Sequence, residues 1–348
     1  MKPKITLKDI AKELGVSKST VSRALNDSPE ISDEMKEKVK AFAELYHYKP
    51  NVLAMKLRNK KTMVIGVIIP EIVHHFFSRV ISGIEKIANE NEYNVMICLS
   101  NESFDKEVLN VRTLANGSVD GLLISISKET LEKNDFSHFD EAINDGLPLV
   151  FFDRASDEIK CDQVIVDDIG GGYKATKHLI EEGCKRIAIL TTPDYVSVGK
   201  LRMQGYVKAL SENNLDLNKG YVVKVQENAN FRDQILDFFE KTPVLPDGIV
   251  CVNEIYAATA IKIAKQKGLT VPDDIAVIGF TDGLISEFSS PSLSTVAQHG
   301  FTMGEQAAQL LLNRINNKNT EDIDYEKVII STDIKKRDST KKMQESML

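Results

Sequence analysis

The chain has 348 residues, of which 42% are hydrophobic, and a formal net charge of -7 at pH 7. This length suits two or three domains with a sizeable core. No run of eighteen apolar residues occurs, which argues against a membrane-spanning helix, and the N-terminus lacks the apolar segment of a secretion signal. Four scattered cysteines without a CxxC pair are typical of a reducing compartment, so we expect a cytoplasmic protein.

The charge is divided unevenly along the chain. Residues 1–62 contain 14 Lys and Arg against 8 Asp and Glu, so this segment is basic while the remainder is acidic. A basic segment on an acidic protein suggests contact with a polyanion. Small helical segments are also often rich in lysine for no such reason, and charge alone does not separate the two interpretations.

The first fifty residues show only helical periodicity. A periodic apolar face from Leu7 to Leu14 predicts a first helix, with Thr6 as its N-cap. Gly15 then breaks the chain, Ser17 is placed to cap a second helix, and a third helix follows Ser32. Three short helices with a tight glycine turn between the first two are typical of a helix-turn-helix.

A short connecting segment follows this unit. The pair Lys49-Pro50 ends it, because proline disfavours helix at the residue before it. Residues 51–58 suit about two helical turns, too few for a helix that is stable alone. We therefore expect a helix-turn-helix domain over residues 1–48 and a hinge helix with linker over 49–62.

From residue 63 onward, short β-branched strands alternate with amphipathic helices. Apolar strands separated by helices indicate parallel sheets covered on both faces. Ten strands are many for one domain, so we predict two α/β lobes, lobe 1 at about 63–161 and 293–320 and lobe 2 at about 162–292 and 321–337. Residues 338–348 are expected to form a disordered tail. The ten predicted strands are 63–69, 95–99, 121–125, 148–152, 163–167, 186–190, 222–225, 248–252, 275–279 and 328–331.

The second predicted helix has a polar outward face. With its apolar residues turned inward, Lys18, Ser19 and Arg23 point outward. A helix that enters the major groove needs donors near its N-terminal end, where Arg or Lys can pair with guanine. Hydroxyl side chains suit phosphates, which set the register on DNA. Taken alone, these residues fit a solvated helix face equally well.

Three segments together resemble a known family. TLKDIAKELGVSKSTVSRALN (residues 6–26) is similar to the N-terminal signature of the lactose/galactose repressor (LacI/GalR) family of bacterial transcriptional regulators. Residues 48–57 resemble the family's hinge helix, and residues 172–190 and 291–298 resemble its effector-binding core. The resemblance covers residues 4 to about 337. It implies a small all-α helix-turn-helix head plus an α/β periplasmic-binding-protein-like core of two parallel-sheet lobes.

The resemblance implies DNA contacts residue by residue. Lys18, Ser19 and Arg23 occupy base-reading positions, and Leu57 matches an apolar wedge that enters the minor groove at the operator centre. Such a wedge unstacks a base step and bends the duplex, which needs two symmetry-related copies. Met55 replaces the family's usual hinge arginine. The other implied interface residues are Thr6, Leu7, Ser17, Thr20, Ser22, Asn26, Asn51 and Ala54.

The resemblance also implies an effector cleft between the lobes. Phe76 and Phe77 match an aromatic wall that suits the C–H face of a sugar or a base. Asp153 ends a strand at the carboxyl edge, where open α/β sheets bind ligands. Each polar cleft residue taken singly is also an ordinary strand-end or cap residue. The implied polar contacts are Ser127, Asp153, Arg202, Asn253, Asp282 and Gln298, with Thr281 standing where the family commonly has an aspartate.

No catalytic or metal site is predicted. Gly199-Lys200 lacks the spacing of a nucleotide-binding loop. His74 and His75 are adjacent rather than four residues apart and have no third ligand nearby. A Gly-x-Ser-x-Gly nucleophile motif does not occur. We expect no cofactor.

These features predict a sequence-specific transcriptional regulator that binds a palindromic double-stranded DNA operator as a homodimer. We expect a repressor, although the sequence also leaves an activator open. A small-molecule effector, expected to be a carbohydrate and otherwise a nucleobase, would control it from the cleft. Two alternatives come from other classes: a solute-binding receptor without a DNA function, and a sugar-modifying enzyme. The sequence leaves open whether the effector releases or promotes DNA binding and whether dimers pair into tetramers.

Overall fold

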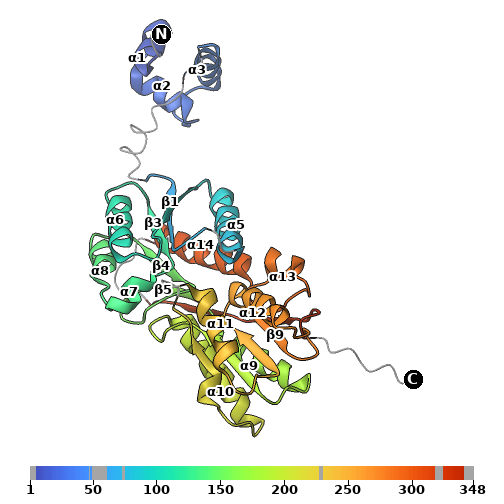
Figure 1. Ribbon diagram of the computed structural model, residues 1–348. Helices are drawn as coiled ribbons and strands as arrows, with labels where there is room; N and C mark the ends of the chain where they lie inside the picture. Colours follow the sequence, from blue (N-terminus) through green and yellow to red (C-terminus); the bar gives the residue numbers. More distant parts are fainter. Residues whose placement is uncertain are drawn as a thin grey trace. The chain divides into compact units, whose positions relative to one another are not determined.

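A computed structural model describes residues 5–46, 48, 61–72, 75–226, 230–317 and 324–340. The chain divides into two compact units, Met1–Thr62 and Met63–Leu348, and each is described by itself (Figure 1).

The N-terminal unit contains three helices, α1 (Leu7–Glu13), α2 (Lys18–Leu25) and α3 (Asp33–Leu45). The helices enclose a small apolar core, as the predicted helix-turn-helix requires. Half-buried side chains, among them Leu7 and Phe42, pack around this core. Its buried members are Ile10, Ala11, Val21, Ala24, Val39 and Ala43.

Side-chain caps and one glycine fix the turn between the first two helices. Thr6 and Asp9 form a capping box, in which Thr6 N donates to Asp9 Oδ2 at 2.9 Å and Asp9 N donates to Thr6 Oγ1 at 3.4 Å. Ser17 Oγ accepts the backbone N–H of Thr20 at 3.0 Å at the start of α2. Gly15 has φ +65°, a conformation that glycine adopts without the steric cost of a Cβ. These caps and the glycine turn fix the direction of α2 relative to α1.

Lobe 1 of the core unit is built on a six-stranded sheet with the order β11-β5-β4-β3-β1-β2, and all its strand pairs are parallel. Two apolar clusters cover its faces, and successive residues of β1 alternate between them: Val67 faces the cluster of α5 and α14, and Ile68 the cluster of α6 and α8. Its elements are β1 (Val64–Ile69), α5 (His75–Glu90), β2 (Asn94–Leu99), α6 (Phe104–Ala115), β3 (Gly121–Ile124), α7 (Lys128–Lys133), α8 (Ser137–Asn144), β4 (Leu149–Phe152), β5 (Asp162–Val166), α14 (Gly300–Asn316) and β11 (Lys327–Ile330).

Lobe 2 repeats this plan with the order β12-β10-β9-β8-β6-β7, in which only the pairing of β12 with β10 is antiparallel among the described strands. One large apolar cluster joins its sheet to its helices. Its elements are α9 (Asp168–Glu181), β6 (Ile187–Thr191), α10 (Ser197–Glu212), the 3-10 turn η1 (Lys219–Tyr221), β7 (Val222–Lys224), α11 (Phe231–Lys241), β8 (Gly248–Cys251), α12 (Glu254–Gln266), β9 (Ala276–Phe280), α13 (Leu284–Phe288), β10 (Ser294–Ala297) and β12 (Asp333–Lys335).

Helices α9 and α10 approach each other through glycine. A Cβ added to Gly172 would lie 2.1 Å from the carbonyl oxygen of Arg202, and one added to Gly205 would lie 2.1 Å from that of Ile169. Only glycine therefore allows these two backbones to touch. This close approach places Arg202 directly against α9.

The predicted lobe boundaries are wrong at three strands. Residues 162–166 were expected in lobe 2, but β5 pairs with β4 of lobe 1. Likewise β11 pairs with β5 in lobe 1, and β10, expected in lobe 1, pairs with β9 in lobe 2. The reason is that the chain crosses between the lobes three times, between β5 and α9, between β10 and α14, and between β11 and β12. The chain changes lobe after β5, β10 and β11, whereas the predicted boundaries lie before these three strands.

Two of these crossings are joined by a hydrogen bond. His299, between β10 and α14, has φ +53° and lies with Nε2 2.9 Å from Asp333 Oδ2, at the start of β12.

The predicted disordered tail begins too early. Ser339 and Thr340 are buried, and Ser339 Oγ accepts Ser294 N at 2.8 Å and donates to Val277 O at 2.5 Å. Asp338, Ser339 and Thr340 thus satisfy polar groups of lobe 2, which a disordered segment cannot do. Residues 341–348 lie outside the described residues.

Candidate functional site

The exposed face of α2 carries the predicted base-reading residues. Lys18, Ser19 and Arg23 are all exposed. Arg23 Nη1 lies 2.7 Å from Glu30 Oε2, but both side chains are more than half exposed. Such surface ion pairs contribute about 0–1 kcal/mol, so this one is readily exchanged for a DNA contact.

The implied phosphate contacts on the head also have roles within it. Ser17 Oγ lies 2.6 Å from Ser19 Oγ and 2.8 Å from Thr20 Oγ1, so three hydroxyls gather at the N-terminus of α2. Asn26 is the C-cap of α2, and its Nδ2 donates to Ser22 O at 2.5 Å. Thr6 caps α1, while Leu7 is half-buried against the apolar core.

Three implied DNA contacts fall in the hinge. Asn51, Ala54 and Leu57 lie outside the described residues, and their roles stay predictions from the resemblance.

The core unit contains a cavity of about 90 Å³ that both lobes line. Lobe 1 contributes the start of α5 and the residues that follow β3 and β4, and lobe 2 contributes the residues that follow β6, β8 and β9 and the start of α10. Six of the eight predicted effector contacts line it, namely Phe76, Phe77, Asp153, Arg202, Asn253 and Gln298.

Arg202 is the most constrained of these residues. Its Nε donates to Asp168 Oδ1 at 2.7 Å, its Nη1 donates to Val252 O at 2.6 Å, and its guanidinium carbon lies 4.1 Å from the centroid of the Phe280 ring. Arg202 and Asp168 are both buried. Burial raises the pKa of Asp168 to about 6, and Arg202 opposes this rise.

The remaining polar groups of the cavity are held at strand ends. Asn253 Oδ1 accepts Tyr256 N at 2.7 Å and so caps α12, and Gln298 Oε1 accepts Thr281 Oγ1 at 2.9 Å. Asp153 has φ +60°, and its Oδ2 accepts Ser125 Oγ at 3.4 Å. Burial raises the pKa of Asp153, while Arg154 and Arg202 oppose the rise. The cavity therefore presents fixed donors, acceptors and one apolar aromatic wall.

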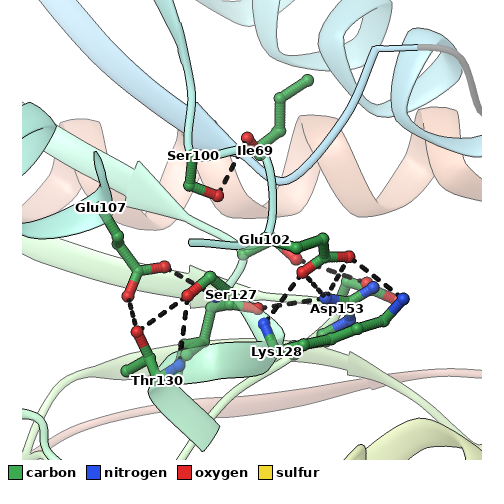
Figure 2. Close-up of polar contacts among 11 residues, drawn as sticks. Ile69, Ser100, Glu102, Glu107, Ser127, Lys128, Thr130 and Asp153 are labelled. Atoms are coloured by element: carbon green, nitrogen blue, oxygen red, sulfur yellow. Dashed lines mark hydrogen bonds and ion pairs between the residues drawn. The ribbon is translucent and has the colours of Figure 1, made fainter. Parts of the chain in front are cut away.

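Two predicted effector contacts lie elsewhere. Ser127 is fully buried, with its backbone N donating to Glu107 Oε2 at 2.6 Å and its Oγ 2.8 Å from Thr130 Oγ1, as Figure 2 shows. It starts α7 as an N-cap. Asp282 pairs with Arg337 Nη2 at 2.5 Å and lines a neighbouring cavity of about 370 Å³. A capping role and an ion pair account for these two residues.

The sequence analysis missed several residues that line the cavity. Lys128 and Arg154 add charge, and Thr192 adds a hydroxyl. All three follow strand ends, so the rule that ligands bind at the carboxyl ends of parallel strands would have found them. The other missed lining residues are Val196, Val198 and Val252. Thr281, which stands where the family commonly has an aspartate, lines the cavity as well.

Two groups of exposed apolar side chains in the core unit each gather on one or two elements. In lobe 1 they lie on the edge strand β2 and on α6, and in lobe 2 on the short helix α13. We call these two sets the apolar patches. They consist of Met96, Ile97, Leu99 and Leu109 in lobe 1, and Leu284, Ile285 and Phe288 in lobe 2.

The described residues were also compared with the patterns of a metal site and of a membrane-spanning helix. No three His, Cys, Asp or Glu side chains gather as metal ligands would within the part of the chain that the structure describes. Among these same residues, no helix is long and apolar enough to cross a membrane.

A helix-turn-helix with exposed cations and a two-lobed core with a lined polar cavity define a DNA-binding regulator that senses a small molecule. Known proteins support this class. Residues 6–51 match the bacterial regulatory proteins of the lacI family, and residues 176–340 match the periplasmic binding protein-like domain. The ribose operon repressor of Haemophilus influenzae is 33% identical over 316 residues, covering 90% of this chain and 93% of the relative. The chain therefore belongs to the lacI family of bacterial regulatory proteins.

Solved structures show the same fold. The lac repressor dimer bound to operator and the anti-inducer ONPF has a TM-score of 0.84 at 24% identity, covering 97% of this chain and 99% of that chain. The complex of the transcriptional regulator CelR with cellobiose has a TM-score of 0.70 at 26% identity, covering 97% of this chain and all of that chain. The predicted fold and the predicted class, a DNA-binding transcriptional regulator with an effector-binding core, are thus confirmed.

Proposed function

We propose that this regulator represses transcription by binding a palindromic operator as a homodimer, and that a carbohydrate in the cleft between the lobes controls its affinity for DNA. The observation that carries the proposal is the exposed face of α2, which carries Lys18 and Ser19 at its capped N-terminus and Arg23 in its last turn. This is the arrangement with which a recognition helix reads base edges in the major groove.

The residues of α2 divide by role. Arg23 and Lys18 are suited to the O6 and N7 acceptors of guanine, at about 1–3 kcal/mol of discrimination for each good bidentate pair. The hydroxyls of Ser17 and Thr20 lie at the positive end of the helix, where phosphates bind. We assign base reading to Arg23 and Lys18, and phosphate contacts to Ser17 and Thr20.

A homodimer follows from the symmetry of a palindrome, because two-fold DNA is read by two-fold protein. The apolar patches support this assembly. Contiguous exposed apolar side chains mark association surfaces, and Phe288 is 76% exposed in the single chain. We place a second copy of the chain on these patches.

The carbohydrate assignment rests on the cavity and on relatives. Phe76 and Phe77 provide an apolar wall beside donors and acceptors that suit hydroxyl groups. A relative is named for the ribose operon, and a similar structure holds cellobiose. An effector that favours one arrangement of the lobes by about 1–3 kcal/mol changes DNA affinity about 5- to 150-fold. A regulator of bacterial genes acts where the chromosome lies, so we place the protein in the cytoplasm.

The DNA assignment is tested on an operator selected from random duplexes with the full-length protein. Arg23→Ala should relax the base preference at one position of each half-site and weaken binding about 10- to 100-fold. Lys38→Ala, on the exposed side of α3, is the matched control and should leave the base preference unchanged. Equal preference in both variants would exclude α2 as the recognition helix.

The hinge and the effector are tested on the same operator. Leu57→Ala should weaken specific binding far more than non-specific binding, since a wedge acts only where the duplex is bent. Equal loss of both would exclude the wedge. A set of neutral and charged carbohydrates is then screened by thermal shift, and those that bind should alter operator affinity. If none does so while operator binding is intact, the carbohydrate assignment fails.

A further inference from the structure

A second cavity adjoins the effector cavity in the cleft. Its volume is about 370 Å³, whereas that of the effector cavity is about 90 Å³. Phe76, Thr281 and Gln298 line both, so these three side chains form the partition between them. Pockets for small molecules usually measure about 300–1,000 Å³, and of these two cavities the second is in that range. A ligand that enters the effector cavity therefore has room to extend past the partition.

The partition presents a hydrogen-bond donor to such a ligand. Thr281 Oγ1 donates to Gln298 Oε1 at 2.9 Å. Gln298 is 5% exposed, and its Nε2 makes no hydrogen bond with any residue that the structure describes. An amide donor that is nearly buried and lacks an acceptor is costly. A ligand hydroxyl group at the partition would satisfy it.

Both lobes line the second cavity, as they line the first. Lobe 1 contributes the N-terminal parts of α5 and α14. Lobe 2 contributes the residues that follow β9 and the ends of β10 and β12. An effector acts by favouring one arrangement of the protein over another. Contact with both lobes in the second cavity is suited to this role.

Each cavity has an aromatic wall. In the effector cavity, the rings of Phe76 and Phe77 lie with their centroids 5.4 Å apart. In the second cavity, the half-buried ring of Phe301 joins that of Phe76. Two apolar walls with a polar pair between them suit a ligand of two rings, each with an apolar face and a hydroxyl-bearing rim.

Polar groups lie around Phe301 in the second cavity. The guanidinium carbon of Arg79 lies 5.1 Å from the centroid of the Phe301 ring, and Thr302 provides a hydroxyl. Asp282, which was expected to contact the effector, lines this cavity although it also pairs with Arg337. Because a hydroxyl group both donates and accepts, one sugar unit can bond to the guanidinium and to the carboxylate alike.

We propose that the effector is a disaccharide or a larger glycoside, with one unit against Phe76 and Phe77 and the next in the second cavity against Phe301. The inference rests on the proposed carbohydrate function and narrows its ligand class. Arg79 and Thr302 then contact only the second unit, so they determine selectivity for two units over one.

The test measures affinities of the full-length protein by calorimetry. Glucose and fructose are compared with maltose, cellobiose, trehalose and sucrose, which are built from them. At least one disaccharide should bind ten-fold or more tightly than each of its constituents. Arg79→Gln should remove most of this advantage, and Thr302→Trp, which fills the second cavity, should abolish it. Both variants should keep the monosaccharide affinity of the wild type.

Lys86→Gln is the matched control. Lys86 Nζ lies 5.8 Å from the centroid of the same Phe301 ring, but Lys86 does not line the cavity. This variant should therefore keep the full advantage of the disaccharide.

The possible outcomes separate the inference from the proposed function. A monosaccharide that binds as tightly as every disaccharide and alters operator affinity overturns the inference and leaves the proposed function standing. A full disaccharide advantage in both Arg79→Gln and Thr302→Trp also overturns it, because the second unit would then lie elsewhere. Equal loss of both kinds of sugar in these variants overturns it as well. If no carbohydrate alters operator binding, the proposed function fails and the inference fails with it.

Discussion

The ion pair between Arg202 and Asp168 should contribute strongly to the stability of the core unit, and this contribution can be measured. The two side chains are 6% and 3% exposed, and their atoms lie 2.7 Å apart. Removing one partner of a buried pair leaves an unpaired charge and costs about 3–5 kcal/mol. Arg202→Met keeps the aliphatic stem but also abandons Val252 O and the Phe280 ring. We expect the free energy of unfolding to fall by about 3–5 kcal/mol in this variant.

A double-mutant cycle isolates the pair. Urea unfolding is measured for the wild type, Arg202→Met, Asp168→Asn and the double variant. Because removing both charges leaves neither unpaired, the double variant should recover about 1.5–3 kcal/mol relative to the sum of the two single losses. The exposed pair Lys241–Asp237, an i,i+4 pair on α11, is the control and should give a coupling of about 0.3–0.5 kcal/mol. Equal coupling in the two cycles would refute the reasoning.

The result also bears on effector binding. An Arg202 variant that loses ligand response has lost either a contact or the shape of lobe 2. Arg202→Lys separates these possibilities, because it retains the charge near Asp168 and loses the planar fork. Recovery of stability without recovery of ligand affinity would assign Arg202 a direct contact.

Three further predictions concern pH, packing and assembly. Burial raises the pKa of Asp168 from its ordinary value of 3.8 to about 6. The protonated carboxyl therefore stabilises the folded state below pH 4, and this stabilisation is lost as the pH rises to about 6. The unfolding free energy of the wild type relative to Asp168→Asn should therefore fall by about 3 kcal/mol across this window, as urea titrations can measure; a constant difference would contradict the shift. Gly172→Ala, with its Cβ 2.1 Å from the carbonyl oxygen of Arg202, should cost about 1–3 kcal/mol by calorimetry, and an unchanged Tm would contradict the close approach. Phe288→Asp should weaken the homodimer at least ten-fold in sedimentation, whereas Val244→Asp, also exposed, should not; equal behaviour would remove the patch from the interface.

Local signals explain why the helix-turn-helix could be predicted from the sequence. Thr6, Gly15 and Ser17 act on neighbours within three residues, and each cap and turn lies where the sequence places it. Strand positions in the core were predictable for the same reason, since each strand is an apolar run. Two strands, β10 and β12, escaped prediction, since the serine- and threonine-rich β10 and the short, polar β12 lack such a run.

Properties that depend on distant segments were not predictable. Lobe membership is decided by pairings such as β11 with β5, which join residues more than 150 positions apart. The cavity shows the same limit. Ser127 and Lys128 are adjacent, yet only Lys128 lines it, because Glu107 holds Ser127 inside lobe 1. The strand-end rule identifies Arg154 as a lining residue, but its pairing with Glu102, which lies on a separate loop, was not predictable.

The three chain crossings determine what kinds of motion are open to the core. Two rigid bodies joined by one strand of chain can separate, slide or turn in any direction. Three joints that lie side by side remove separation and sliding, and leave bending and twisting about the line through them. The hydrogen bond of His299 with Asp333 links two of these joints. A ligand that holds the lobes at one angle therefore selects among few relative arrangements of the two lobes.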